Sequence, residues 1–213
     1  MDIKSTHEAN ANMSEARTID IIAVHGLDEF DARGKCSDSS WEDPLDKELD
    51  GGWLGASVRE ICGKSAKFTI RLFFYTFDST NTFCASADGL SNEAYSLLEQ
   101  ICMNRSQEVL FLGQGLGGLL VKQALLNAFL SSDFCQVKRW TKGLAFFGTP
   151  HSRESELRSG SHKGFFESLF CSTAPGLQIP PTLSNDFRHQ LEDFLYISFY
   201  GNNDEATGRH AFG

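Results

Sequence analysis

The chain has 213 residues, of which 41% are hydrophobic, and its formal net charge at pH 7 is −9. This length predicts a single domain that is large enough to bury a continuous core. The acidic balance, with no cluster of Lys or Arg, argues against a nucleic-acid-binding surface and against a patch for anionic membranes.

The six cysteines form no C-x-x-C pair and no zinc-like spacing with histidine, so we expect no metal ion and no other cofactor. Residues 1–17 are polar and lack the apolar centre of a secretory signal, and no window approaches 18 apolar residues without charge. With reduced thiols, these features favour a cytoplasmic protein without a transmembrane segment.

Five short apolar runs alternate with helical patterns along the chain. The runs are 19–24, 68–75, 108–112, 142–147 and 194–200, and the helical patterns are 53–62, 91–102, 116–130 and 183–195. Most runs are apolar on successive residues, as is typical of strands covered on both faces. The sequence therefore predicts an α/β fold with a doubly wound, mostly parallel sheet.

Two of the helical patterns carry further detail. The pattern at 91–102 has one apolar face, and Ser91 is the expected N-cap with Glu93 in the first turn. The pattern at 116–130 is apolar nearly all round, apart from a polar strip of Lys122, Gln123 and Asn127. It therefore predicts a helix that is packed deep against the sheet.

The remaining segments suggest how the chain is organised. We expect a flexible lead at 1–17, one domain at 18–200 and an irregular tail at 201–213. Within the domain, 28–52 is predicted to be a long polar loop and 151–182 an irregular region with three prolines.

Small or polar residues follow every predicted strand. In such a sheet the ligand crevice lies outside the carboxyl ends of the strands, so these residues are the candidate lining of a crevice. They are His25, Gly26, Asp78, Ser79, Gly113, Gln114, Gly115, Thr149, His151 and Asp204. At any single strand end, a simple need for turn residues is the favoured explanation.

The stretch 113–118, GQGLGG, joins a predicted strand to a predicted helix. In an α/β-hydrolase this context carries the nucleophile in the pattern G-x-S-x-G, but here the central position is Gly115. The same stretch satisfies G-x-G-x-x-G, the dinucleotide-binding fingerprint, with Asp133 twenty residues further on. Asp133 precedes the next predicted strand rather than following it, and two strands precede the fingerprint, so NAD binding is disfavoured.

Taken in order, several segments resemble the lipase-like α/β-hydrolase domains related to the GPI inositol-deacylases. The segments are IIAVHGL, Trp41, Trp53-Leu54, RLFFYTFDS, EAYSLLEQI, FLGQGLGGLLVKQAL, KGLAFFGTPHS and ISFY. The N-terminal domains of fungal NLR-type proteins and the serine-active-site-containing proteins of mitochondria and the ER are the most similar. The resemblance runs from about 19 to 200 and implies an α/β-hydrolase-like fold, with ER or mitochondrial membrane association as an alternative location.

The resemblance places the family's elbow, G-H-S-L-G-G, on Gly113-Gln114-Gly115-Leu116-Gly117-Gly118. The nucleophile position is then Gly115, which has no side chain. The first oxyanion donor is implied at the backbone N–H of Leu116, and the second near Gly26 and Leu27.

The acid and the base of the family are also in doubt. Where the family's last matched strand ends in S-F-Y-E, this chain has Gly201, with Asp204 close but off register. The family's histidine follows a further helix and strand, and His210 is only ten residues past Tyr200. Relative to the family the chain is therefore expected to be C-terminally truncated, with an exposed sheet edge.

Neither of two other histidines restores the base in this interpretation. The His25 imidazole is expected to satisfy buried backbone, and His151 is expected to border the crevice without a catalytic role. Three functions remain open: an inactive hydrolase domain that binds a protein partner or signals, an acyl- or lipid-binding domain, and an active serine esterase with an unrecognised nucleophile. The sequence favours the first.

Overall fold

The structure is a computed structural model, and it describes residues 4–8, 17–26, 29–30, 36–37, 55–58, 60, 68–79, 81–104, 108–149, 151, 179–199, 201–202 and 211–212. Its strands are β1 (Lys4–Glu8), β2 (Arg17–Val24), β3 (Glu29–Phe30), β4 (Cys36–Ser37), β5 (Phe68–Tyr75), β6 (Val109–Gln114), β7 (Thr141–Phe147), β8 (Leu195–Phe199), β9 (Gly201–Asn202) and β10 (Ala211–Phe212). Its helices are the π-helical turn η1 (Asn81–Ala85), α2 (Gly89–Met103), α3 (Leu116–Leu130), α4 (Cys135–Trp140), α7 (Leu183–Arg188) and the 3₁₀ turn η2 (Leu191–Asp193).

The main sheet has six strands in the order β1-β5-β2-β6-β7-β8. The five strands from β5 to β8 are parallel, and β1 pairs with β5 in the antiparallel direction at one edge. The predicted fold class, an α/β fold with a mostly parallel sheet, is therefore confirmed, and all five predicted strands are present. Strand β1 lies in the segment 1–17, where the sequence predicts no strand.

Strand β2 is central in the sheet. It pairs with β5 along its whole length, from Arg17 opposite Phe68 to Val24 opposite Tyr75, and with β6 on its other side. Neighbouring strands on both sides and packed layers on both faces leave its second half buried without interruption. This explains why the strand is apolar on successive residues instead of alternating residues.

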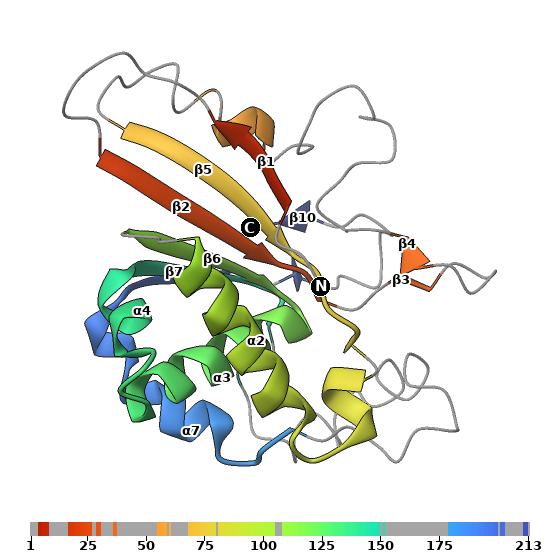
Figure 1. Cartoon of the computed structure of the whole chain (residues 1–213). Helices are drawn as coiled ribbons and strands as arrows, with labels where there is room; N and C mark the ends of the chain where they lie inside the picture. The colour runs from red at the N-terminus through yellow and green to blue at the C-terminus, as the bar shows by residue number, and fades with distance from the viewer. Residues whose placement is uncertain are drawn as a thin grey trace.

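The helices form a layer on one face of the sheet. Helices α2, α3, α4 and α7 all lie on this side (Figure 1), and their apolar side chains share the larger hydrophobic core with β2, β6 and β7. The short helical segment 55–58 contributes Val58 to a smaller core on the opposite face. Helical segments on both faces of a parallel sheet make the sheet doubly wound.

Helix α3 begins at Leu116 and ends at Leu130, as predicted, and most of its side chains are buried. Two of the three polar residues of its strip are buried as well. Asn127 donates to the carbonyl oxygen of Ser91 on α2 at 3.3 Å, so the polar group satisfies a contact between two helices. The ammonium of Lys122 lies 3.4 Å from the hydroxyl of Ser184 on α7.

The prediction that Ser91 is the N-cap of its helix is wrong. Helix α2 begins two residues earlier, at Gly89, and Asp88 occupies the N-cap without a side-chain hydrogen bond. At this first helical position the chain packs closely against η1: a Cβ on Gly89 would lie 2.6 Å from the carbonyl oxygen of Thr82. Glu93 consequently lies beyond the first turn, where its carboxylate accepts a 2.5 Å hydrogen bond from the Tyr75 hydroxyl.

The helix predicted at 183–195 is also shorter than expected. Helix α7 ends at Arg188, and the 3₁₀ turn η2 follows. The backbone N–H groups of Gln190, Asp193 and Phe194 each bond to a carbonyl three residues earlier, which tightens the chain before β8 begins. The sequence also missed α4, a six-residue helix between α3 and β7.

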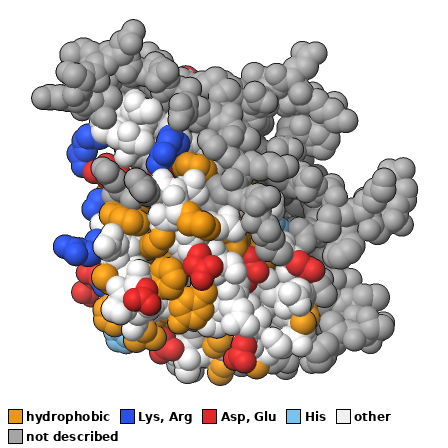
Figure 2. Space-filling view, viewed as in Figure 1, with side chains coloured by type: hydrophobic (Ala, Val, Ile, Leu, Met, Phe, Trp, Pro, Cys, Tyr) orange, Lys and Arg blue, Asp and Glu red, His pale blue; other side chains and the backbone are white. Residues whose placement is uncertain are grey.

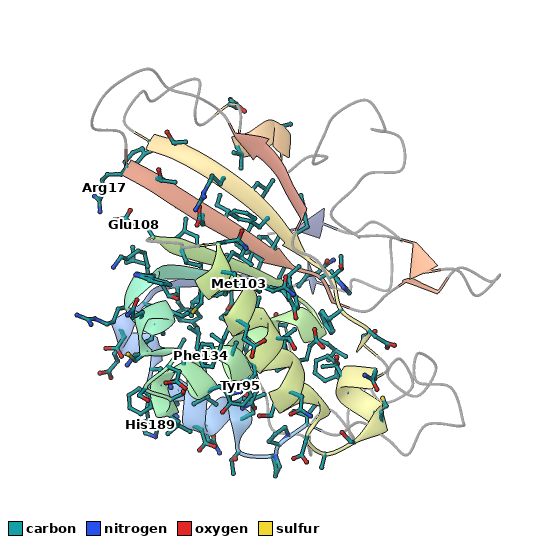
Figure 3. All side chains as sticks on the ribbon, in the orientation of Figure 1. Arg17, Tyr95, Met103, Glu108, Phe134 and His189 are labelled. Atoms are coloured by element: carbon teal, nitrogen blue, oxygen red, sulfur yellow. The ribbon has the colours of Figure 1, made fainter. Side chains whose placement is uncertain are left out.

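Two ion pairs tie β2 to its neighbours. Arg17, at the start of β2, pairs with Glu108, just before β6, and Figure 3 shows the two side chains together at one end of the sheet. The guanidinium of Arg71 on β5 binds both carboxylate oxygens of Asp20 at 2.6 and 2.7 Å, although Asp20 is only 1% exposed. Such a bidentate pair compensates the burial of the carboxylate.

The visible surface of the helical layer mixes apolar and acidic side chains, whereas Lys and Arg side chains gather to one side of it (Figure 2). In the described part of the chain, no helix has both the length and the apolar character that crossing a membrane requires.

Candidate functional site

The ends of β2 and β6 form a topological switch point. Strand β2 lies between β5 and β6, so the chain passes from β2 to β5 on one side and then crosses to β6 on the other. Ligands of open α/β sheets bind at such a point, outside the carboxyl ends of the two strands. Here these ends carry His25-Gly26 and Gln114-Gly115.

Gly115 forms the turn between β6 and α3. Its backbone has φ +51° and ψ −123°, the positive φ expected of a nucleophile elbow. The turn is held from both sides, because the N–H of Gly115 donates to the carbonyl of Phe147 on β7 at 2.9 Å and its own carbonyl accepts from Gly118 at 3.3 Å. The predicted strand–turn–helix arrangement is therefore confirmed.

The other glycines of the stretch are required by close backbone packing. A Cβ on Gly117 would lie 2.5 Å from the carbonyl oxygen of Val24, and one on Gly113 would lie 2.6 Å from the Cα of Gly118. A Cβ on Gly118 would overlap the side chain of Thr149. At Gly115, by contrast, the Cα of Gly26 is the only described atom that the Cβ would meet, at an ordinary 3.6 Å. The described residues around the elbow therefore leave room for a side chain at the position where none is present.

Backbone donors at the elbow are the candidate oxyanion groups. Leu116 is the first residue of α3, and the first N–H groups of a helix have no partner within it. Gly26 lies beside the elbow, because a Cβ on it would be 3.0 Å from the carbonyl oxygen of Gln114. Leu27, the other predicted contributor, lies outside the described residues. The structure thus brings Leu116 and Gly26 together at the switch point.

His25 has a structural role at the end of β2. Its side chain is 5% exposed, its Nε2 accepts a hydrogen bond from the backbone N–H of Phe77 at 3.1 Å, and its ring stacks on that of Phe77 at 4.6 Å. The expectation that this imidazole satisfies buried backbone is confirmed. It joins the end of β2 to the segment that follows β5.

The candidates after β5 belong to the turn that starts η1. Asp78 is exposed, and its carboxylate accepts from the N–H of Asn81 at 2.8 Å. Ser79 is buried, with 1% of its surface exposed. This turn chemistry is the role that the sequence favours at any single strand end.

Thr149 follows β7 and packs on the elbow. Its hydroxyl donates to the carbonyl of Gly113 at 3.3 Å, and its side chain fills the space over Gly118. Gly148, just before it, has φ +58° and donates to the carbonyl of Phe199 at 2.9 Å. Gly148 and Thr149, the first two residues of the sequence GTPH at 148–151, therefore hold the end of β7 against the elbow and against β8.

His151 contacts side chains from two strands, β8 and β7. Its Nε2 lies 3.1 Å from the hydroxyl of Ser198 on β8, and its ring meets the edge of Phe146 at 5.2 Å between centroids. Burial and the positive charge of Lys122 lower its pKa to about 4, so the imidazole is neutral at pH 7.

Lys122 is a functional-site candidate that the sequence did not single out. Its side chain is 2% exposed, and its ammonium lies 5.8 Å above the ring of Phe146. Burial lowers its pKa to about 8. The signal available in the sequence was a lysine on a helix that is otherwise apolar nearly all round, but only the fold shows that α7 and β7 cover it.

The remaining candidate residues are one aspartate in a described turn and two residues outside the described part of the chain. Asp133 lies exposed in the turn between α3 and α4, before β7 in the chain rather than after it. Asp204 and His210 lie outside the described residues. Among the described side chains, no group of His, Cys, Asp and Glu is arranged to hold a metal ion.

A separate hollow lies between α3, α4 and α7. Its volume is about 530 Å³, and it is lined by Leu126, Phe129, Leu183 and Gln190, among others. These residues come from the second half of α3, from α7 and from the turn before η2, not from the elbow. The predicted crevice and this hollow are therefore different places on the molecule.

No protein-family model and no curated protein sequence matches the chain. Among solved structures, the mature lipase BlEst2 of Bacillus licheniformis is 12% identical with a TM-score of 0.48, and the match covers 92% of this chain and 71% of that one. With the propeptide form of the same lipase, the match covers 39% of that chain.

Two further solved structures are also distantly similar to this chain. A carboxylesterase of the thaumarchaeon Nitrososphaera gargenis is 7% identical, with a TM-score of 0.43 and coverage of 94% of this chain and 90% of that one. The α/β-hydrolase MGS-MChE2, from a sediment metagenome of the Mar Chica lagoon in Morocco, is 16% identical, with a TM-score of 0.38 and coverage of 93% and 88%. The chain is thus distantly similar in structure to lipases and esterases.

Proposed function

We propose that this protein is an α/β-hydrolase-like domain without hydrolase activity that acts as a binding or signalling module. The observation that carries the proposal is Gly115. It occupies the turn between β6 and α3 with φ +51°, where a Cβ would lie at an ordinary 3.6 Å from the Cα of Gly26, and it has no side-chain atom to attack a carbonyl. Hydrolysis needs both a polarised carbonyl and an activated nucleophile, and only the first requirement is met at this turn.

The sequence adds a further gap to the missing nucleophile. Gly201 stands where the resemblance to the GPI inositol-deacylase group implies the acid. His25, which lies next to the elbow, has its Nε2 occupied by the N–H of Phe77. Its imidazole is therefore committed to the backbone rather than to proton transfer.

The groups that remain suit a ligand with a carbonyl or carboxylate. The N–H of Leu116 opens α3, and the positive end of a helix dipole attracts a negatively polarised oxygen. We therefore infer an acyl- or lipid-like ligand as the small-molecule alternative to a protein partner. By resemblance, the protein itself would be a module of the kind that is attached to fungal NLR-type receptors.

A fluorophosphonate probe tests the absence of activity. We expect no stoichiometric labelling of the protein and no hydrolysis of p-nitrophenyl esters above a heat-denatured control. Stoichiometric labelling, or turnover by the native protein, would overturn the proposal.

A thermal-shift series with fatty acids tests the ligand. We expect a saturable rise in melting temperature for the parent protein if the elbow binds the carboxylate. The rise should be lost in Gly26→Val, whose side chain would enter the space beside Gln114 and Gly115. Gly148→Ala, whose Cβ has no described atom within 4 Å, is the matched control and should keep the shift. No shift with any chain length leaves the protein partner as the proposed occupant.

The pair of Ser198 and His151 favours one second candidate, an esterase with a displaced nucleophile. Their side chains are 3.1 Å apart, which is the distance between a serine nucleophile and its base. A pKa of about 4 makes His151 a weak base at neutral pH. If the probe labels the parent protein but not Ser198→Ala, this candidate replaces the first, whereas labelling that survives in Ser198→Ala refutes it.

A further inference from the structure

Strand β8 presents an open edge with an apolar surface. It is the last strand of the sheet order, and among the described strands none pairs with its outer side. Leu195 is 81% exposed, Tyr196 50% and Ile197 52%. Most proteins protect such an edge with a charge, a proline or a bulge, because an unpaired strand is a template for another strand. The sequence of β8, LYISF, contains no charge and no proline.

The backbone directions along β8 identify which groups are free to pair. The carbonyl of Phe199 accepts from Gly148, so it points toward β7. Residues two apart on a strand direct their N–H and C=O groups to the same side. The backbone N–H and C=O groups of Leu195 and Ile197 therefore also point toward β7. Those of Tyr196 and Ser198 point outward, away from the sheet.

We propose that β8 pairs with β8 of a second copy of this chain in the antiparallel direction, about a two-fold axis at Ile197. This register overlaps all five residues of the strand. It places Tyr196 opposite Ser198 of the partner subunit as a hydrogen-bonded pair, and the two-fold axis repeats this pair, for about four backbone hydrogen bonds in all. The two outward-pointing residues of each strand are the ones that this register needs.

The side chains agree with the same register. The two copies of Ile197 face each other at the axis, in a non-hydrogen-bonded pair where side chains approach most closely. Leu195 lies opposite Phe199 of the partner subunit, on the face where Phe199 already stacks on Phe147 at 4.8 Å between ring centroids. The pairing therefore buries the exposed apolar side chains of one face against each other.

Charge does not oppose the pairing. The acidic residues nearest to β8 are Glu192 and Asp193, directly before Phe194. In the proposed register they fall opposite positions 202 and 201 of the partner subunit, which are Asn and Gly in the sequence. No acidic residue is placed opposite another along this stretch, so like-charge repulsion is avoided.

Sedimentation velocity from about 1 µM to about 100 µM tests the proposal on the full chain. We expect a concentration-dependent species of twice the 23.6 kDa mass of one chain. Ile197→Lys should shift the protein to monomer, because two ammonium groups then meet at the axis. Met103→Lys is the matched control, since Met103 is 72% exposed on α2 (Figure 3), and it should associate like the parent.

A mixture of two variants separates loss of pairing from loss of folding. Ile197→Lys and Ile197→Asp should each be monomeric, and an equimolar mixture should restore the dimer through opposite charges at the axis. A parent protein that stays monomeric over the whole range would overturn the proposal. So would an Ile197→Lys variant that dimerises as well as the parent, or a mixture that stays monomeric while both variants keep the melting transition of the parent.

Discussion

Replacing Gly115 with serine tests the elbow most directly. Its φ of +51° is a conformation that a non-glycine residue holds at a cost of about 1–3 kcal/mol. Among the described residues the new Cβ meets only the Cα of Gly26, at 3.6 Å, so steric overlap with them adds little to this cost. Loss of glycine also lowers the entropy of the unfolded chain, which offsets about 0.4–1 kcal/mol.

The net expectation for Gly115→Ser is a loss of about 1–2 kcal/mol in the free energy of unfolding, which corresponds to a drop of about 2–8 °C in melting temperature for a chain of this size. Gly148→Ser is the matched control, because Gly148 has φ +58° and no described atom lies within 4 Å of its Cβ position. It should cost a similar amount, since it shares the backbone strain and the lack of close contacts among the described residues but not the elbow.

The measurements are a melting curve and p-nitrophenyl ester hydrolysis for the parent and both variants. We expect no turnover from Gly115→Ser, because its hydroxyl has no base committed to it. A melting temperature equal to or above that of the parent would refute the strained elbow. Turnover well above that of both the parent and Gly148→Ser would refute the inactive site.

Three further predictions concern packing and charge. Gly117→Ala should destabilise the fold by more than Gly115→Ser in the same melting assay, because its Cβ would collide with the carbonyl oxygen of Val24. An equal or smaller loss of stability would contradict the close approach of α3 to β2. Lys122→Met should raise the free energy of unfolding by about 3 kcal/mol below pH 8, and this gain should fade from pH 8 to pH 10.5. The reason is that the folded state holds the pKa of Lys122 at about 8, whereas its pKa in the unfolded state is near 10.5. A gain that is independent of pH in denaturant titrations would refute this prediction. Arg71→Met should lower the free energy of unfolding by about 3–5 kcal/mol, because it leaves the Asp20 carboxylate buried without its partner. The double variant with Asp20→Asn should recover part of this loss. No recovery would show that the two side chains are not coupled.

A fourth prediction of the same group concerns acid stability. The folded pKa of His151 is about 4, below the ordinary 6.5, so folding stability should fall as the pH drops from 6.5 toward 4. His151→Gln should lack this part of the acid dependence, because glutamine does not titrate. Identical pH profiles for the two proteins in the same denaturant titrations would contradict the burial of the imidazole.

The sequence by itself determined the five parallel strands of the main sheet and the elbow. Strands with packing on both faces need successive apolar residues, and this pattern located all five parallel strands. The stretch from Val109 to Leu130 was also readable, because a strand, a glycine turn and a buried helix each have a local pattern in the chain. The positive φ of Gly115 followed from the same local pattern.

The strand order, the role of His25 and the surroundings of Lys122 were decided only by the tertiary structure. His25 and Phe77 are 52 residues apart in the chain, and Lys122 meets Ser184 across 62 residues. No periodic pattern encodes such pairs, because they depend on which elements become neighbours after the chain has crossed from β5 to β6. The same holds for the start of α2, where Gly89 closely approaches the carbonyl of Thr82. It also holds for the exposure of β8, which follows from the place of this strand at the edge of the sheet rather than from its apolar sequence.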